Sequence, residues 1–91
     1  MLIERFENAL FEIHRELIAL FPDLRIEPRI ADVADGARMQ AVFKGDKPDI
    51  VFHAAAHKHV PMMEANPGEA IKNNVGGTRI LADLADLHGV A

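Results

Sequence analysis

Cysteine and tyrosine are both missing from the 91 residues of this chain. Without cysteine the chain has no disulfide framework, no thiolate zinc ligand and no cysteine nucleophile, and a small domain without disulfides fits a cytoplasmic setting. Without tyrosine it cannot hold a Tyr-x-x-x-Lys acid–base pair. It also contains no G-x-G-x-x-G phosphate loop, because Gly76-Gly77 lies inside a predicted helix and Gly45 precedes a break at Pro48.

Charge and hydrophobic runs exclude further kinds of partner. The net charge is −4 and no basic block is large enough to grip a phosphate backbone, which argues against nucleic acid. No apolar stretch approaches the ~20 residues of a membrane-spanning helix, and the first ten residues do not resemble a secretory signal. We therefore expect no membrane contact by this segment. With 49% apolar and 26% charged residues, the composition is that of one small globular domain.

The first third of the chain predicts a strand, a helix and a second strand. Leu2-Ile3-Glu4 is typical of the end of a strand that finishes on a carboxylate. Residues 8–21 repeat apolar side chains every three or four positions, which predicts an amphipathic helix stopped by Pro22. Its apolar face would contain Leu10, Ile13, Leu17, Leu20 and Phe21. Residues 24–30 alternate apolar and polar, and Pro28 places this strand at a sheet edge.

A helix and a buried strand are predicted next. Asp32 or Asp35 can cap a short helix that Gly45 to Pro48 ends, and its apolar face would contain Met39, Val42 and Phe43. Residues 49–56 form an apolar run without alternation, which is typical of a strand covered on both faces in a parallel sheet.

The last helix is predicted from its start signal. Asn66 would be the N-cap, Pro67 the first helical residue and Glu69 the partner in a capping box. The residues expected to be buried are Ile71, Val75, Thr78, Leu81 or Ala82, and Leu84 or Ala85, with Gly89 ending the helix. Alternating strands and helices predict an α/β fold with a parallel sheet and flanking helices.

Three histidines and a glutamate in "FHAAAHKHVPMME" raise the question of a metal site. A zinc ion needs three or four converging donors, whereas His53 ends a predicted strand and its side chain would diverge from the others. His57 and His59 alone make a poor site. The sequence therefore predicts no metal, with His53 in a hydrogen bond and the other two histidines on a loop.

Several residues stand where a dinucleotide could bind. Ala54, Ala55 and Ala56 fall at the carboxyl end of a predicted parallel strand, where small side chains admit a flat ligand or, alternatively, let a helix pack closely. Glu4 could bind ribose hydroxyls and Arg5 a 2′-phosphate, which leaves NAD and NADP both open; the two could equally be an ordinary charge pair.

The remaining candidates have ordinary alternatives. Asp32-Val33 could meet an adenine, although helix capping is the commoner role of such an aspartate. Lys58 could reach a pyrophosphate or simply be solvated. Asn73 and Asn74 lie within a helix, where asparagine is poorly favoured, and are expected to be exposed.

The block "DIVFHAAAHKHVPMMEANPGEAIKNNVGGTRIL" closely resembles the CapD-type polysaccharide biosynthesis proteins. These are nucleotide-sugar 4,6-dehydratases and epimerases of the extended short-chain dehydrogenase/reductase superfamily. Residues 54–78 match the signature HAAA-x-KHVP-x-ME-x-NP-x-EA-x-x-x-N-x-x-GT almost throughout, and "IERFENALFEIHREL" resembles the acid-ended strand and second helix of the family.

The resemblance implies an NAD or NADP cofactor, a nucleotide-sugar substrate of the UDP-amino-sugar type, and roles for individual residues. Glu4 would bind the adenosine ribose, and Asp32 with Val33 would line the adenine. Ala54, Ala55 and Ala56 would flank the cofactor, Lys58 would contact cofactor and nucleotide-sugar, and Asn74 would brace the active site.

The resemblance also implies an incomplete Rossmann-like domain. Relatives begin with a further strand and a glycine-rich turn and continue into a strand with the catalytic residues, so we expect residues 1–91 to be an internal fragment that is inactive by itself. The parent would be an enzyme, and some relatives are membrane-anchored. The unfilled place of the first strand leaves exposed edges, which predicts a homo-oligomer or a strand-swapped dimer.

Overall fold

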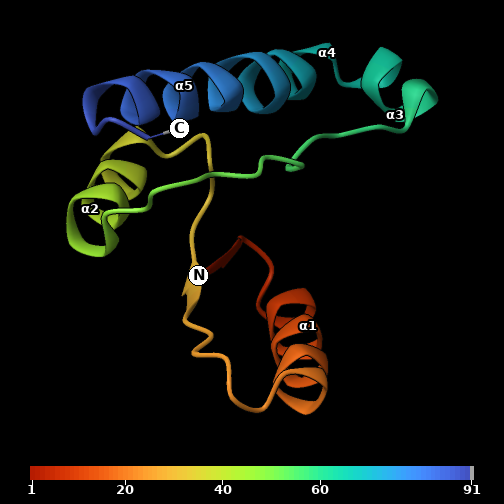
Figure 1. Cartoon of the computed structure of the whole chain (residues 1–91). Helices are drawn as coiled ribbons and strands as arrows, with labels where there is room; N and C mark the ends of the chain where they lie inside the picture. Colours follow the sequence, from red (N-terminus) through yellow and green to blue (C-terminus); the bar gives the residue numbers. More distant parts are fainter. Residues whose placement is uncertain (91) are drawn as a thin grey trace. The chain divides into compact units, whose positions relative to one another are not determined.

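The computed structural model describes residues 1–90, which divide into two compact units (Figure 1). The first unit is Met1–Asp32, and the second begins at Val33. Each contains its own secondary structure and its own buried side chains.

The first unit is a strand, a helix and a parallel strand: β1 (Leu2–Glu4), α1 (Glu7–Leu20) and β2 (Pro28–Ile30). Leu2 lies opposite Pro28 and Glu4 opposite Ile30. The amide of Leu2 donates to the Glu27 carbonyl at 2.9 Å, and the amide of Ala31 donates to the Glu4 carbonyl at 3.2 Å. β2 is shorter than the predicted strand over 24–30 and begins at proline, which has no amide proton to offer a ladder.

Helix α1 confirms the predicted helix but buries less of its apolar face. The amide of Phe21 donates to the Leu17 carbonyl and Pro22 follows, so the helix ends where the proline predicts. Leu10 is 5% exposed, whereas Ile13 is 40% and Leu20 is 62% exposed. Two strands of three residues are too small to cover a helix of 14 residues.

The second unit opens with α2 (Gly36–Asp46), which is capped as the sequence predicts. The Asp35 carboxylate accepts from the amide of Arg38 at 3.1 Å, which satisfies one of the free amides at the helix start. Met39, Val42 and Phe43 are all buried, at 0%, 3% and 1% exposed. α2 packs against α5 (Thr78–Leu87), whose Leu81 and Leu84 complete this core.

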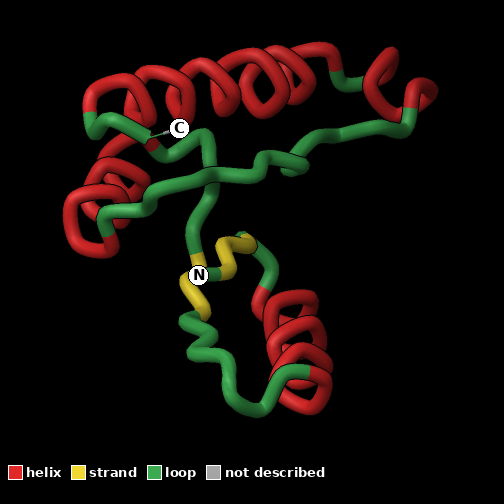
Figure 2. The backbone as a smooth tube through the Cα atoms, viewed as in Figure 1, coloured by secondary structure: helices red, strands yellow, loops and turns green. Residues whose placement is uncertain are grey.

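The predicted strand over residues 49–56 is absent, which corrects that prediction. Figure 2 draws this stretch as loop between α2 and α3 (Val60–Ala65). Phe52 is 95% exposed and Ile50 is 62% exposed, so neither face of the stretch is covered. A strand requires a neighbour for its backbone amides and carbonyls, and within residues 1–90 the only ladder joins β1 and β2. The apolar run alone could not reveal this.

The last helix is three consecutive segments: α4 (Pro67–Glu69), the π-helix η1 (Ala70–Gly77) and α5. Pro67 is the first helical residue as predicted, but the capping box is not formed. The Asn66 side chain instead donates to the Met62 carbonyl at 3.0 Å, and the backbone amide of Asn66 donates to the Met63 carbonyl. Asn66 therefore closes α3, a helix the sequence did not predict, and its own amide is not available to Glu69.

The π-helical segment changes which side chains are buried. Ile71 and Val75, predicted to be in the core, are 64% and 63% exposed, while Asn73 is only 6% exposed. A π-helix bonds i to i+5 and therefore has more residues per turn, which moves the inward-facing positions away from those of an α-helix. Beyond η1, Leu81 and Leu84 are buried as expected, whereas Thr78 is exposed, which corrects the prediction for that residue. Gly89 follows the helix with φ of +66°.

The α/β class is confirmed, with a parallel sheet of two strands in the first unit and helices in both units. Among residues 1–90 no helix is both long and apolar enough to cross a membrane.

Candidate functional site

Three predicted residues come together where the two strands of the first unit end. Glu4 is the last residue of β1, and its carboxylate accepts from the amide of Phe6 at 3.0 Å. Arg5 Nη1 lies 3.7 Å from a carboxylate oxygen of Asp32, and each of these side chains is 34% exposed. The Arg5 guanidinium also lies over the Phe6 ring, 4.6 Å from its centroid.

This cluster presents a carboxylate and an arginine–carboxylate pair at the carboxyl ends of parallel strands. All three charged side chains are partly exposed, so each can exchange its present contact for one with a ligand. Asp32 does not cap α2, because that role belongs to Asp35. The carboxylates can accept from hydroxyl or amino groups, and Arg5 can donate to an anion after leaving Asp32.

In the second unit, the extended stretch 53–57 lies along the last helix and is held there by side chains. Asn74 Oδ1 accepts from the amide of His57 at 2.9 Å, and Asn74 Nδ2 donates to the carbonyl of His57 at 2.9 Å. Asn73 Nδ2 donates to the Ala55 carbonyl at 3.1 Å and to Asn74 Oδ1 at 3.0 Å. His53 Nε2 lies 2.9 Å from Thr78 Oγ1.

These contacts replace part of the missing ladder. Both hydrogen-bonding groups of the His57 backbone are paired with one carboxamide, as they would be with a neighbouring strand. Ala54, Ala55 and Ala56 are meanwhile exposed, as is Lys58. The side chains predicted to contact a cofactor are thus accessible to a ligand, and hydrogen bonds from the helix fix the backbone that carries them.

The remaining predicted residue, Val33, is 8% exposed and lies beside Gly77. A Cβ on Gly77 would lie 2.8 Å from Val33 Cγ2, so only glycine permits this approach. The Val33 side chain is therefore a packing element of the second unit.

Asn73 and Asn74 were expected to be exposed, and that prediction is wrong: Asn73 is buried and Asn74 is half-buried. A buried amide must be hydrogen-bonded, and both asparagines are. The available signal was composition. Two asparagines followed by Gly76-Gly77 make a run that is unfavourable in an α-helix, which is a reason to expect irregular helical geometry.

The histidines are placed as predicted, with His53 in a hydrogen bond and His57 and His59 outside helices and strands. Throughout residues 1–90, no three potential ligands among histidine, aspartate and glutamate converge on a point that could hold a metal ion.

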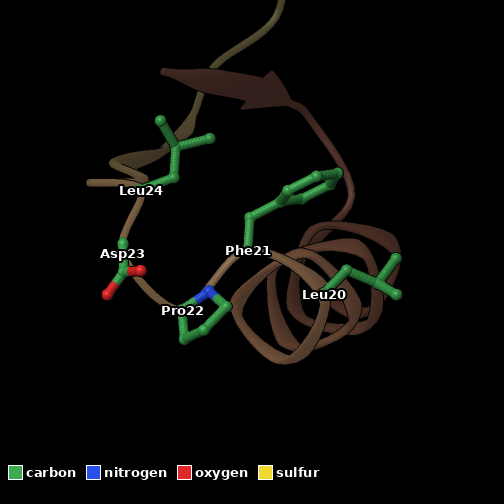
Figure 3. A pocket seen from close by; sticks show the side chains of 5 residues that line it. All are labelled: Leu20, Phe21, Pro22, Asp23 and Leu24. Carbon is green, nitrogen blue, oxygen red and sulfur yellow. The ribbon is translucent and has the colours of Figure 1, made fainter.

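A shallow apolar groove lies at the other end of α1, lined by residues 20–24 (Figure 3). The Asp23 carboxylate is its one charged group, and none of the predicted site residues lines it. It offers no set of convergent polar groups and is not a candidate site.

Comparison with known families assigns the chain. Residues 1–91 match the family model described as "Polysaccharide biosynthesis protein". The chain belongs to this family, which confirms the resemblance found in residues 54–78.

Individual relatives agree. The probable polysaccharide biosynthesis protein EpsC of Bacillus subtilis is 44% identical over 90 residues, covering 98% of this chain and 15% of EpsC. The capsular polysaccharide biosynthesis protein CapD of Staphylococcus aureus is 48% identical over 87 residues, covering 93% of this chain and 14% of CapD. A UDP-N-acetylglucosamine 4,6-dehydratase (inverting) of Campylobacter jejuni is 44% identical over 61 residues, covering 67% of this chain and 18% of the enzyme.

A solved structure is also similar. The X-ray structure of Pen from Bacillus thuringiensis matches with a TM-score of 0.82 and 32% identity, over 97% of this chain and 25% of that one. The chain thus spans about one seventh of the first two relatives and a quarter of this structure.

Proposed function

We propose that residues 1–91 form part of the NAD(P)-binding domain of a nucleotide-sugar 4,6-dehydratase or epimerase acting on a UDP-amino-sugar. The observation that carries the proposal is the 44% identity to a protein named as a UDP-N-acetylglucosamine 4,6-dehydratase. The local geometry supports it, because an acid ends a parallel strand and a run of exposed alanines is held by a helix.

The residues of the first unit fit the adenosine half of a dinucleotide. Glu4 is half-exposed and can accept from ribose hydroxyls once its bond to the Phe6 amide is exchanged. Arg5 can donate to a 2′-phosphate through its guanidinium, and the Asp32 carboxylate can accept from an adenine amino group. Both NAD and NADP are compatible with this set.

The residues of the second unit fit a flat ligand. Ala54, Ala55 and Ala56 are exposed and have no side chain beyond Cβ, so a ligand can approach their backbone closely. Lys58 is exposed and can place a positive charge beside a phosphate of the cofactor or of the nucleotide-sugar.

When bound, the cofactor supplies reversible hydride transfer with C4 of the sugar, and in a dehydratase water leaves across C5–C6 between the two transfers. In this proposal, residues 1–91 bind the cofactor and orient it toward the sugar. We assign no catalytic acid, base or nucleophile to residues 1–91.

Replacement of the matching segment in the Campylobacter dehydratase by these residues tests the proposal. The chimera is expected to bind NAD(P) and to turn over UDP-N-acetylglucosamine. Ala55→Trp in the chimera should abolish cofactor binding by filling the surface of the alanine run, whereas Ala82→Trp, at an exposed alanine of α5, should not. A folded chimera that binds neither NAD nor NADP would contradict the proposal.

A second candidate function is self-association through residues 49–52. Ile50 and Phe52 are 62% and 95% exposed on a stretch that pairs with no strand among residues 1–90, and such edges accept strands from other chains. We propose that two copies of the chain associate here. Sedimentation should show a concentration-dependent dimer that Phe52→Lys weakens, and a wild-type protein that stays monomeric at high concentration would rule this out.

A further inference from the structure

Asn73 is the one buried polar side chain of the described residues, and its environment is unusual. At 6% exposure it offers almost no surface to a ligand, yet its carboxamide donates twice, to the Ala55 carbonyl and to Asn74 Oδ1. Both acceptors take part in the hydrogen bonds that hold residues 55–57 along the helix.

The bond between the two asparagines is a third contact that favours one orientation of the Asn74 carboxamide. An asparagine carboxamide can be turned by 180°, which exchanges its oxygen and nitrogen. In the turned orientation Asn74 would aim its NH2 group at the His57 amide and at Asn73 Nδ2, so that donors would face donors. The observed orientation matches the amide and the carbonyl of His57, and the bond from Asn73 Nδ2 to Oδ1 adds to its preference over the turned one.

The π-helix makes the arrangement possible. Successive side chains diverge less around a helix with i to i+5 bonds than around an α-helix, so neighbouring residues can serve one stretch of backbone. Asn73 and Asn74 both lie in η1 and both reach residues 55–57.

We propose that Asn73 is a positioning residue that acts through Asn74 to fix the backbone of residues 55–57. It reinforces the observed orientation of the Asn74 carboxamide and anchors the Ala55 carbonyl directly. The consequence for cofactor binding rests on the proposed function, because residues 54–58 are the proposed cofactor contacts.

Amide exchange in the 91-residue chain tests the positioning role without any cofactor. Asn73→Ala should speed hydrogen exchange at the His57 amide by about tenfold, which is the change in the opening equilibrium expected from the loss of one hydrogen bond. The amides of Met39 and Phe43 should keep their exchange rates. The control Lys72→Ala, at an exposed residue of the same π-helix, should leave His57 unchanged. Unchanged exchange at His57 in folded Asn73→Ala would overturn the proposal.

A second measurement covers the case in which Asn73→Ala does not fold. In the wild-type chain, the carboxamide protons of Asn73 and Asn74 should exchange several-fold more slowly than those of Asn8, which is exposed on α1. Equal rates for all three asparagines would overturn the proposal.

NAD+ binding to the chimera with the Campylobacter dehydratase separates this inference from the proposed function. Asn73→Ala in the chimera should raise the dissociation constant for NAD+, and Lys72→Ala should not. If the exchange results hold and the chimera without either substitution does not bind NAD+, the cofactor assignment fails while the positioning role of Asn73 stands.

Discussion

The two stretches that carry the proposed cofactor contacts are held by different means. Glu4 ends a strand whose backbone is paired with β2, and Leu2 and Glu4 both take part in that ladder. Residues 53–57 have no strand beside them among residues 1–90, and three side chains of a helix hold them instead. A ladder depends on backbone and tolerates most substitutions, whereas a side-chain clamp depends on the identity of a few residues.

The largest expected effect concerns the core of the second unit, where α2 packs against α5. Phe43→Ala should lower the free energy of unfolding of the second unit by about 3–5 kcal/mol, because the ring is 1% exposed and its removal leaves a cavity. Phe52→Ala is the matched control, since this ring is 95% exposed. Chemical denaturation of dilute protein measures both. A loss of unfolding free energy at position 52 as large as that at position 43 would show that the stretch around Phe52 is packed. It would then not be held by side chains of the helix alone.

The glycine pair of the π-helix gives the next effect. Gly77→Ala should destabilise by about 1–3 kcal/mol, because its Cβ would meet the short, stiff Val33 side chain at 2.8 Å. Gly76→Ala is the control, since its Cβ would lie 3.6 Å from the Ile71 carbonyl oxygen, and alanine there should be neutral or stabilising. Equal thermal midpoints for the two variants would mean that the helix does not approach Val33 this closely.

A smaller effect distinguishes the two residues that the sequence predicted as helix N-caps. Asp35→Ala should cost about 0.5–2 kcal/mol, because it removes the acceptor for the Arg38 amide. Asn66→Ala should cost less, because the Asn66 side chain does not cap the helix that follows it. Urea unfolding monitored by circular dichroism compares them, and a larger loss for Asn66→Ala than for Asp35→Ala would contradict this order.

The smallest effect is electrostatic and lies in the first unit. The pKa of Glu27 is lowered from its ordinary 4.5, first by the hydrogen bond and charge of Arg25 and then by those of Arg29. Arg25 Nε lies 2.7 Å from the carboxylate, and Arg29 Nη1 lies 3.5 Å from it. A lowered folded-state pKa stabilises the fold above pH 4.5, and this stabilisation is lost as the pH falls through the lowered value.

NMR titration of the Glu27 carboxyl group checks the order of the two causes. Arg25→Ala should return the pKa of Glu27 most of the way to its ordinary value, and Arg29→Ala should return it less. The reverse order would place Arg29, not Arg25, as the main partner. Glu27→Gln should remove this contribution to the pH dependence of stability.

The sequence predicted those features whose causes are local. The end of α1 follows from Pro22, the cap of α2 from Asp35, and the buried face of α2 from the spacing of its apolar residues. It also predicted the end of β1 on Glu4 and the resemblance that the family match confirms.

The failures came where structure depends on distant partners. The apolar run 49–56 predicts a strand, but a strand forms only beside another, and that is not a property of the run. Asn66 met the rule for an N-cap while its side chain served the preceding helix. Asn73 was expected to be exposed because asparagine is poorly favoured within a helix, whereas in the π-helix it is buried and bonded to the distant Ala55 carbonyl.

The most direct test of the account concerns Glu4, the residue on which the proposed binding of a dinucleotide chiefly depends. In the chimera with the Campylobacter dehydratase, Glu4→Gln should weaken NAD+ binding by about tenfold or more, because hydrogen bonds from ribose hydroxyls to a charged acceptor would become weaker neutral ones. Glu7→Gln, at an exposed acid in the first turn of α1, should leave the dissociation constant unchanged. Equal dissociation constants for the Glu4 and Glu7 variants would contradict the account.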